Sequence, residues 1–161
     1  MQDIIKVGMA DLRVAKAPQI LTTLGLGSCV GIALYDNGNK IAGLAHIMLP
    51  DSTQIKNNSN KAKFADTAMD VLLGELIKNG ASRNKLTAKI AGGAQMFSLE
   101  SQSEMMKIGT RNVQATKTLL NILKIPLLAE DTGGNFGRTI EIYPDTGVLL
   151  VKAIGKGKTE L

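Results

Sequence analysis

The sequence predicts an α+β protein, a layered α/β sandwich with mixed β-sheets and two main helices. Short apolar runs typical of strands gather toward both ends of the chain, and two longer segments with helical periodicity lie between them. Of the 161 residues, 44% are hydrophobic. A chain of this length buries about 70% of the surface that its unfolded form exposes. We therefore expect a single domain over residues 1–161.

Eight segments are rich in apolar and β-branched residues and end at turn-forming residues. After the last of them, lysines dominate, and we expect residues 152–161 to form a frayed basic tail. The polar stretch 51–63 is typical of a surface loop. The expected strands cover residues 4–14, 20–24, 29–36, 40–48, 86–91, 127–131, 138–143 and 148–153.

Two helices are expected, over residues 61–79 and 110–124. In the first, apolar residues recur at helical spacing, Ser59 or Asn60 can cap the start, and Asn79-Gly80 can end it. Pro126 follows the second helix. Its inward face is expected to hold Val113, Thr116, Leu119, Leu120 and Leu123.

The net charge and the composition indicate which classes of binding partner fit this protein. The net charge is +5 and the pI about 9.4, but aromatic residues make up 3% and tryptophan is absent, so stacking platforms for bases are scarce. A solvated basic surface or an acidic protein partner fits better than nucleic acid. No apolar run approaches the roughly 18 residues that span a bilayer, and the first residues lack a signal-peptide pattern. We expect a cytoplasmic protein without membrane insertion.

The sequence contains one cysteine and one histidine. A disulfide framework within the chain is excluded, and a structural zinc site, which takes four such ligands, is not expected. Asn37-Gly38 is a hairpin signal between two apolar runs. If it forms a two-residue loop, Asp36 pairs with Asn39, and the same register places Cys29 directly opposite His46.

A thiol and an imidazole in contact support nucleophilic acyl transfer. The thiolate attacks a carbonyl, and the imidazole donates a proton to the leaving group. The alternative is structural, because a single cysteine is often a small buried apolar residue and a single histidine a hydrogen-bonded core residue. Spacing alone leaves both interpretations open.

The segment Thr23-Leu24-Gly25-Leu26-Gly27-Ser28-Cys29 precedes the expected strand and favours the catalytic interpretation. Its glycines permit close approach of a substrate, and the N–H groups of Ser28 and Cys29 can stabilise an oxyanion. No Lys-Ser/Thr follows, so a phosphate loop is not indicated. Gly92-Gly93 and Gly133-Gly134 can form bare turns or cleft walls. Glu130 and Asp131 are either metal ligands or orienting groups, or solvated carboxylates at a strand end.

Six motifs occur in an order that resembles the CheD family of chemotaxis proteins, over nearly the whole chain. They are Gly25-Leu26-Gly27-Ser28-Cys29-Val30, Ala45-His46-Ile47-Met48-Leu49-Pro50-Asp51, Lys63-Phe64-Ala65-Asp66-Thr67-Ala68, Ala91-Gly92-Gly93-Ala94, Ile108-Gly109-Thr110-Arg111-Asn112-Val113 and Ala129-Glu130-Asp131-Thr132-Gly133-Gly134.

The resemblance implies an amidohydrolase that converts particular glutamine side chains of methyl-accepting chemotaxis receptors to glutamate and ammonia. It implies a catalytic set of Cys29, His46 and Thr23, with Thr23 orienting the imidazole. From the residues themselves, we expect substrate or oxyanion binding at Gly27, Ser28, Gly92 and Gly93. The resemblance also implies a fold similar to toxin deamidase catalytic domains, no metal or organic cofactor, and binding and activation of the CheC phosphatase. The alternative is a non-catalytic adaptor that binds CheC and receptors.

Overall fold

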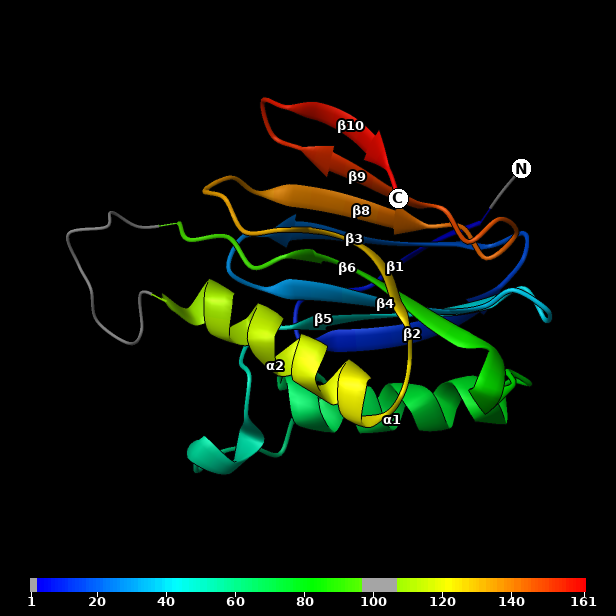
Figure 1. Cartoon of the computed structure of the whole chain (residues 1–161), viewed down its shortest axis with the longest axis horizontal. Coiled ribbons are helices and arrows are strands. Elements are labelled where there is room, and N and C mark those ends of the chain that lie inside the picture. The colour runs from blue at the N-terminus through cyan, green and yellow to red at the C-terminus, as the bar shows by residue number, and fades with distance from the viewer. Residues whose placement is uncertain (1–2, 97–106) are drawn as a thin grey trace.

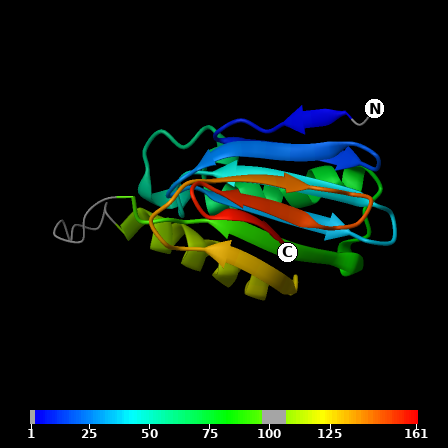
Figure 2. The same cartoon turned by 90° about the horizontal axis from the view of Figure 1, so that it is seen from above.

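The structure is a computed structural model that describes residues 3–96 and 107–161. Two sheets lie face to face, and two helices cover the free face of one of them (Figure 1). The strands of both sheets run along the long axis of the molecule (Figure 2). In chain order the strands and α-helices are β1 (Ile4–Lys6), β2 (Asp11–Lys16), β3 (Ile20–Leu26), β4 (Val30–Asp36), β5 (Ile41–Ile47), α1 (Ala65–Lys78), β6 (Leu86–Gly92), α2 (Ile108–Ile122), β7 (Leu127–Thr132), β8 (Arg138–Ile142), β9 (Leu149–Ala153) and β10 (Gly157–Glu160).

The outer sheet has the strand order β1-β3-β8-β9-β10, and the inner sheet has the order β2-β5-β4-β6-β7. Both sheets are mixed, because β1 pairs with β3 and β6 with β7 in parallel, while the other pairs are antiparallel. The helices α1 and α2 pack on the inner sheet. The predicted α+β sandwich with mixed sheets and two main helices is therefore confirmed. Within the described residues, no helix is long and apolar enough to cross a membrane.

Successive residues of β4 face different cores, as the pleat of a strand requires. Val30, Ile32 and Leu34 belong to the core between the inner sheet and the helices. Ala33 and Tyr35 belong to the core between the two sheets. The strand is buried along its whole length because it lies in the middle layer.

Two glycines allow the three layers to pack closely. A Cβ on Gly43 would lie 2.7 Å from Leu72 Cδ1 of α1, and a Cβ on Gly31 would lie 2.5 Å from Ile140 Cδ1 of the outer sheet. Real Cβ contacts of that length essentially do not occur, so a side chain at either position would force the Leu72 or Ile140 side chain to move.

The helix α1 begins later in the chain than the sequence predicts, and the helix α2 begins earlier. Asn60 caps a 3₁₀ turn over Lys61–Lys63 rather than α1 itself, and its side chain accepts a hydrogen bond from Ala62 N. The helix α1 then starts at Ala65 and ends as predicted, with Asn79 at the C-cap and Gly80 at a φ of +103°. The loop before it is pinned to α1, because Ser52 donates from N and from Oγ to the Asp66 carboxylate.

The expected strand over residues 4–14 is two strands in different sheets. The chain turns between them, where Ala10 has a φ of +56°. The expected frayed tail is also incorrect, because residues 157–160 form β10, which pairs with β9. Backbone hydrogen bonds between Leu161 and Leu149 extend this pairing. The lysines of the tail thus lie on an ordered sheet edge.

The predicted hairpin register is wrong by two residues. Asp36 pairs with Ile41 rather than Asn39, so Gly31 and not Cys29 lies opposite His46. The loop holds four residues because the Asp36 carboxylate accepts hydrogen bonds from Asn39 N and Asn39 Nδ2. Lys40, the last residue of the loop, has a φ of +52°. In a two-residue loop at Asn37-Gly38, positive φ would instead fall on those two residues. A shift by two keeps each side chain on its face, so Cys29 and His46 still share one.

We expect Asp36→Ala to lower the free energy of unfolding by about 2–3 kcal/mol. Asp36 is fully buried, and its carboxylate also accepts from Ser82 N at 2.6 Å. Burial alone would raise the pKa of this carboxyl, but the hydrogen bonds from Ser82 and Asn39 keep the pKa below its ordinary 3.8. Urea unfolding measures the loss.

The matched control is Asp145→Ala, beside the same hairpin. The side chain of Asp145 is 67% exposed and pairs with Lys40 at 3.8 Å, so its loss changes stability by no more than about 0.5 kcal/mol. Equal effects of the two substitutions would contradict the role given to Asp36.

Candidate active site

The three predicted catalytic residues come from segments of both sheets, and two of them, Thr23 and His46, are in direct contact. Thr23 lies on β3 of the outer sheet, His46 on β5 of the inner sheet, and Cys29 directly before β4. All three are buried, with exposed fractions of 0%, 1% and 8%. The sequence prediction named these residues, and the Thr23–His46 contact joins the two sheets.

The Thr23 hydroxyl fixes the tautomer of the histidine ring. Thr23 Oγ1 lies 2.7 Å from Val7 O and 2.7 Å from His46 Nδ1. A hydroxyl has one hydrogen, and a carbonyl can only accept, so Thr23 donates to Val7 and accepts from Nδ1–H. Neutral His46 therefore carries its proton on Nδ1. Its Nε2 is a buried acceptor without a hydrogen-bond partner among the described residues.

The neighbouring residue Thr22 does not share this role. Its hydroxyl donates to Ile140 O at 2.8 Å, within the outer sheet. Side chains of successive strand residues point to opposite faces, and Thr23 is the one that points toward the inner sheet.

Cys29 is the diagonal neighbour of His46 on the shared face. Gly31 pairs with His46, and Cys29 lies two residues earlier on the same strand path. Diagonal neighbours in an antiparallel pair are about 7–8 Å apart at Cα, somewhat less at Cβ, which lets a long or aromatic side chain reach across. Gly31, which pairs with His46, has no side chain, and Ile140 Cδ1 of the outer sheet occupies the space where its Cβ would lie.

Burial keeps both groups neutral. It raises the pKa of the Cys29 thiol above its ordinary 9.0, although the backbone N–H of Cys29 opposes this. It lowers the pKa of His46 below its ordinary 6.5. At neutral pH the resting pair is therefore a thiol and an unprotonated Nε2, rather than a thiolate and an imidazolium.

A cavity of about 340 Å³ opens over Cys29. Gly27 and Ser28, two of the predicted substrate-binding residues, lie in its wall. Methionines make up much of the remainder, and their flexible side chains adapt to the shape of a bound group. The lining residues are Met9, Gly25, Gly27, Ser28, Cys29, Met48, Ala94, Met96 and Ile108.

Gly92 and Gly93, also predicted to bind substrate, lie behind the cysteine rather than in the cavity lining. A Cβ on Gly92 would lie 2.2 Å from Cys29 O, and one on Gly93 would lie 2.2 Å from Val113 Cγ2 of α2. Both have positive φ, of +110° and +66°. These glycines let β6 and α2 approach the backbone of Cys29.

Two buried residues that the sequence prediction gave no role support the backbone around Cys29. Asn112 of α2 is fully buried and donates from Nδ2 to Ser28 O and Met48 O. Arg138 is 1% exposed, pairs with Asp131 at 3.0 Å and reaches Gly92 O at 3.4 Å. A signal for Asn112 was available, since it lies one helical turn before Thr116 on the predicted inward face.

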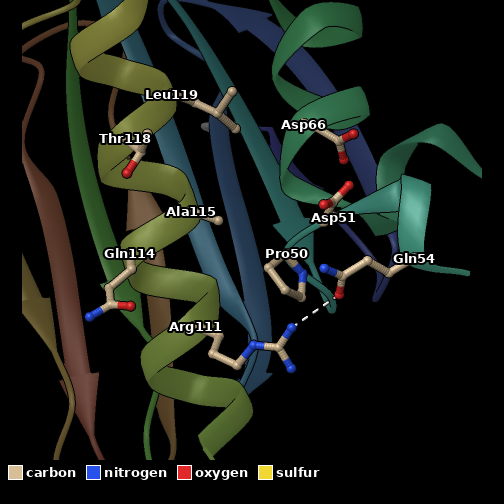
Figure 3. Close-up of a pocket in the computed structure, with 9 residues that line it drawn as sticks. All are labelled: Pro50, Asp51, Gln54, Asp66, Arg111, Gln114, Ala115, Thr118 and Leu119. Carbon is tan, nitrogen blue, oxygen red and sulfur yellow. Dashed lines mark hydrogen bonds between the residues drawn. The ribbon is translucent and has the colours of Figure 1, made fainter. Parts of the chain in front are cut away.

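Further hollows continue from the Cys29 cavity along α2. One of about 470 Å³ shares Ser28, Met48 and Ile108 with it. The next, of about 450 Å³, is drawn in Figure 3, where α2 and the Asp51–Gln54 segment face each other. Arg111 donates to Gln54 Oε1 across this opening at 3.1 Å (Figure 3). The opening over Cys29 is thus one end of a longer uneven surface.

The carboxylates considered as metal ligands or orienting groups form ion pairs instead. Glu130 lies 2.7 Å from Lys117, and the hydrogen bond from Lys117 lowers the pKa of Glu130. Asp131 pairs with Arg138. Among residues 3–96 and 107–161, no three His, Cys, Asp or Glu side chains cluster in a way that could hold a metal ion.

We expect the free energy of unfolding to fall as the pH decreases from neutral to about 5. The unfolded chain protonates His46 near 6.5, while burial lowers the pKa of the folded form, so the unfolded state binds more protons in this window. The contribution of neutral His46 to the free energy of unfolding is fully present above pH 6.5. It is lost as the pH falls toward the pKa of His46 in the folded protein. Urea unfolding at several pH values measures the slope.

The control is His46→Gln, which removes the single histidine of the chain and with it the slope in this window. Asp36, Asp51 and Glu130, whose pKa values are lowered, titrate below 4.5 and do not interfere. A wild-type protein with constant stability between neutral pH and about 5 would show that His46 is not buried in its neutral form.

Comparison with known proteins identifies the family. The family model described as CheD chemotactic sensory transduction matches residues 48–153. The probable chemoreceptor glutamine deamidase CheD of Lachnoclostridium phytofermentans is 58% identical over 161 residues, which cover 100% of both chains. The protein of the same name from Caldanaerobacter subterraneus subsp. tengcongensis is 61% identical over 154 residues, 96% of this chain and 95% of that one.

The chemoreceptor glutamine deamidase CheD of Halalkalibacterium halodurans is 55% identical over 162 residues, which cover 100% of both chains. The full-length alignments include the segment from Thr23 to His46, which lies before the residues matched by the family model. The chain therefore belongs to the CheD family.

Proposed function

We propose that this protein hydrolyses glutamine side-chain amides of chemoreceptors to glutamate and ammonia, with Cys29 as nucleophile, His46 as acid and base, and Thr23 as the residue that orients His46. The observation that carries the proposal is the Thr23–His46 hydrogen bond of 2.7 Å. It leaves His46 Nε2 unprotonated on the sheet face that His46 shares with Cys29. The names of the full-length relatives, chemoreceptor glutamine deamidase, supply the substrate class.

In the first half of the reaction, His46 Nε2 takes the thiol proton as Cys29 Sγ bonds to the amide carbon. The carbonyl electrons move to oxygen, and the N–H groups of Ser28 and Cys29 stabilise the oxyanion. When the carbonyl re-forms, the C–N bond breaks, and the nitrogen takes the proton from His46 and leaves as ammonia. The product on the enzyme is a thioester on Cys29.

In the second half, His46 Nε2 takes a proton from a water molecule that attacks the thioester carbon. The C–S bond breaks, the proton returns to Cys29 Sγ, and the glutamate side chain is released. Nδ1–H stays bonded to Thr23 throughout, so the ring keeps its orientation in both halves. Thr23 has the part that a carboxylate or amide has in other triads. The mechanism needs only residues of this chain and water, and no cofactor.

The proposed substrate and partners are proteins of the chemotaxis system. The net charge of +5 favours an acidic surface, such as a receptor bundle rich in glutamate. We also propose, from the family resemblance, that the protein works in the cytoplasm and binds and activates the CheC phosphatase. The hollows along α2 offer room for segments that flank the target glutamine.

We expect Cys29→Ala to lower the rate of glutamine deamidation by about 10⁴-fold or more, because the substitution removes the nucleophile. Mass spectrometry of a purified receptor cytoplasmic fragment measures the conversion of glutamine to glutamate. Cys29 is a small buried residue, so the fold tolerates alanine, and circular dichroism checks this. Unchanged conversion in the variant would overturn the proposed function.

The same variant separates the enzyme from the adaptor. Binding of CheC is measured with wild type and with Cys29→Ala. Retained CheC binding with lost deamidation supports both proposed roles. Retained chemotactic signalling with lost deamidation would instead favour the non-catalytic adaptor.

We expect Thr23→Val to lower kcat by about 10²- to 10⁴-fold, because the ring loses the acceptor that fixes its tautomer. Nitrogen NMR of the single histidine reports the cause directly. In wild type at neutral pH, Nδ1 is protonated and Nε2 is not. In Thr23→Val the signal shifts toward protonated Nε2.

The matched control is Thr22→Val, which removes a neighbouring buried hydroxyl that bonds to Ile140 O instead of His46. We expect it to lower stability but to leave the tautomer and kcat unchanged. An unchanged tautomer in Thr23→Val, or an equal loss of kcat in both variants, would contradict the orienting role of Thr23.

A further inference from the structure

We infer that Asn112 is a positioning residue for the oxyanion site, because its amide holds the Ser28–Cys29 peptide with the Cys29 N–H turned toward the substrate. The inference rests on the proposed function and assigns a residue of α2 to it. Asn112 does not line the cavity over Cys29 and touches no reacting atom. It acts through the backbone of its neighbours.

The Asn112 side chain joins the two chain segments that carry the nucleophile and the base. Its Nδ2 donates to Ser28 O at 2.9 Å and to Met48 O at 3.0 Å, so both amide hydrogens are used. Ser28 directly precedes Cys29, and Met48 lies two residues after His46. One fully buried amide thus sets the spacing between the two segments.

This amide lies just beyond the end of the β4–β5 ladder. The last backbone pair of that ladder is Val30 with Ile47, and the register ends there. Cys29 and Met48 would form the next pair. Beyond the end of the ladder, the Asn112 side chain donates to one carbonyl of each segment, Ser28 O and Met48 O.

The orientation of the Cys29 N–H follows from the planar peptide. In the described residues the one cis peptide bond is Ala17–Pro18, so the Ser28–Cys29 bond is trans. In a trans peptide the carbonyl and the N–H point in opposite directions. Since Ser28 O points to Asn112, the Cys29 N–H points away from α2. In the described part of the chain, this N–H donates to no backbone carbonyl.

The carbonyls on either side of this peptide are also fixed. Gly27 O accepts from Ala94 N and Cys29 O accepts from Gly93 N, each at 2.8 Å. Three successive carbonyls are therefore held by hydrogen bonds within the protein, and the middle bond comes from a side chain. An oxyanion site needs donors that are oriented before the reaction, and rotation of this peptide would remove one.

The unpaired oxygen of the Asn112 side chain indicates that the site requires the two hydrogens of its amide group. Its Oδ1 is buried and has no hydrogen-bond partner among the described residues. An unpaired buried acceptor is costly, and an apolar side chain would avoid that cost. The amide group nevertheless stands at this position, where its two hydrogens meet two carbonyls.

The test compares two reactions of Cys29 in wild type, Asn112→Ala and the near-isosteric Asn112→Leu. Alkylation by iodoacetamide uses the thiol but forms no oxyanion, while deamidation of the receptor fragment uses both. We expect both variants to keep the alkylation rate within about threefold, with kcat for deamidation lowered by about 10²- to 10³-fold and KM little changed. The single cysteine makes alkylation specific.

The control is Thr116→Val, one turn further along α2. Thr116 is equally buried, and its hydroxyl donates to Asn112 O at 2.9 Å rather than to Ser28 or Met48. We expect both reactions of this variant to match wild type. The control thus separates loss of a buried polar group on α2 from loss of the amide donors.

Three results would overturn the inference. They are deamidation equal to wild type in the Asn112 variants, an equal loss of alkylation and deamidation, and failure of both variants to fold, which would make Asn112 a general requirement of the fold. A wild-type protein that is alkylated but does not deamidate the receptor fragment would overturn the proposed function itself, and the inference with it.

Discussion

The contact between Thr23 and His46 is the constraint on which the rest of the site depends. It is a hydrogen bond between side chains of two different sheets, so its length of 2.7 Å requires the sheets to pack at one defined spacing. The absent side chain at Gly31 allows that spacing, because Ile140 of the outer sheet occupies the place of its Cβ. A threonine hydroxyl can orient a ring in this way only when its own hydrogen has another acceptor. The carbonyl of Val7, which follows β1, is that acceptor.

The position of the cysteine depends on the place where the sandwich opens. Cys29 precedes the first ladder pair of β4, so its peptide is free of the inner sheet while its side chain still faces the other sheet. Contacts from the segment after β6 and from α2 hold the backbone here: Gly93 N, Ala94 N and the Asn112 amide. The close approach of β6 requires glycine at position 92. The site is therefore rigid on the side that faces the protein and open on the side of the methionine-lined cavity.

The sequence was sufficient to predict the layers and both helices, because these follow from apolar periodicity. The scarcity of cysteine and histidine made Cys29 and His46 the candidates for the site. The register could not be predicted. Asn-Gly favours a two-residue loop, but the Asp36 carboxylate binds Asn39 and Ser82, and this contact between distant segments selects a four-residue loop. The shift is even, so Cys29 and His46 kept a common face although they are not directly opposite. Likewise, residues 4–14 divide between two sheets because their backbone hydrogen-bond partners lie far away in sequence. Thr22 is a partner of the first part, and His46 is a partner of the second.

Burial of the proposed catalytic pair has a consequence for selectivity. A thiol whose pKa is raised reacts slowly with reagents from solvent, because the thiolate is the nucleophile. His46, whose pKa is lowered, is available at neutral pH to accept a proton but does not hold a permanent positive charge that would ionise the thiol. Proton transfer then becomes favourable when a carbonyl carbon is in place to receive the sulfur and the oriented N–H groups can stabilise the resulting oxyanion. In the proposed mechanism, the nucleophile is therefore activated by the bound amide rather than before binding. This fits an enzyme that acts on particular glutamines of a protein in the presence of many other amides.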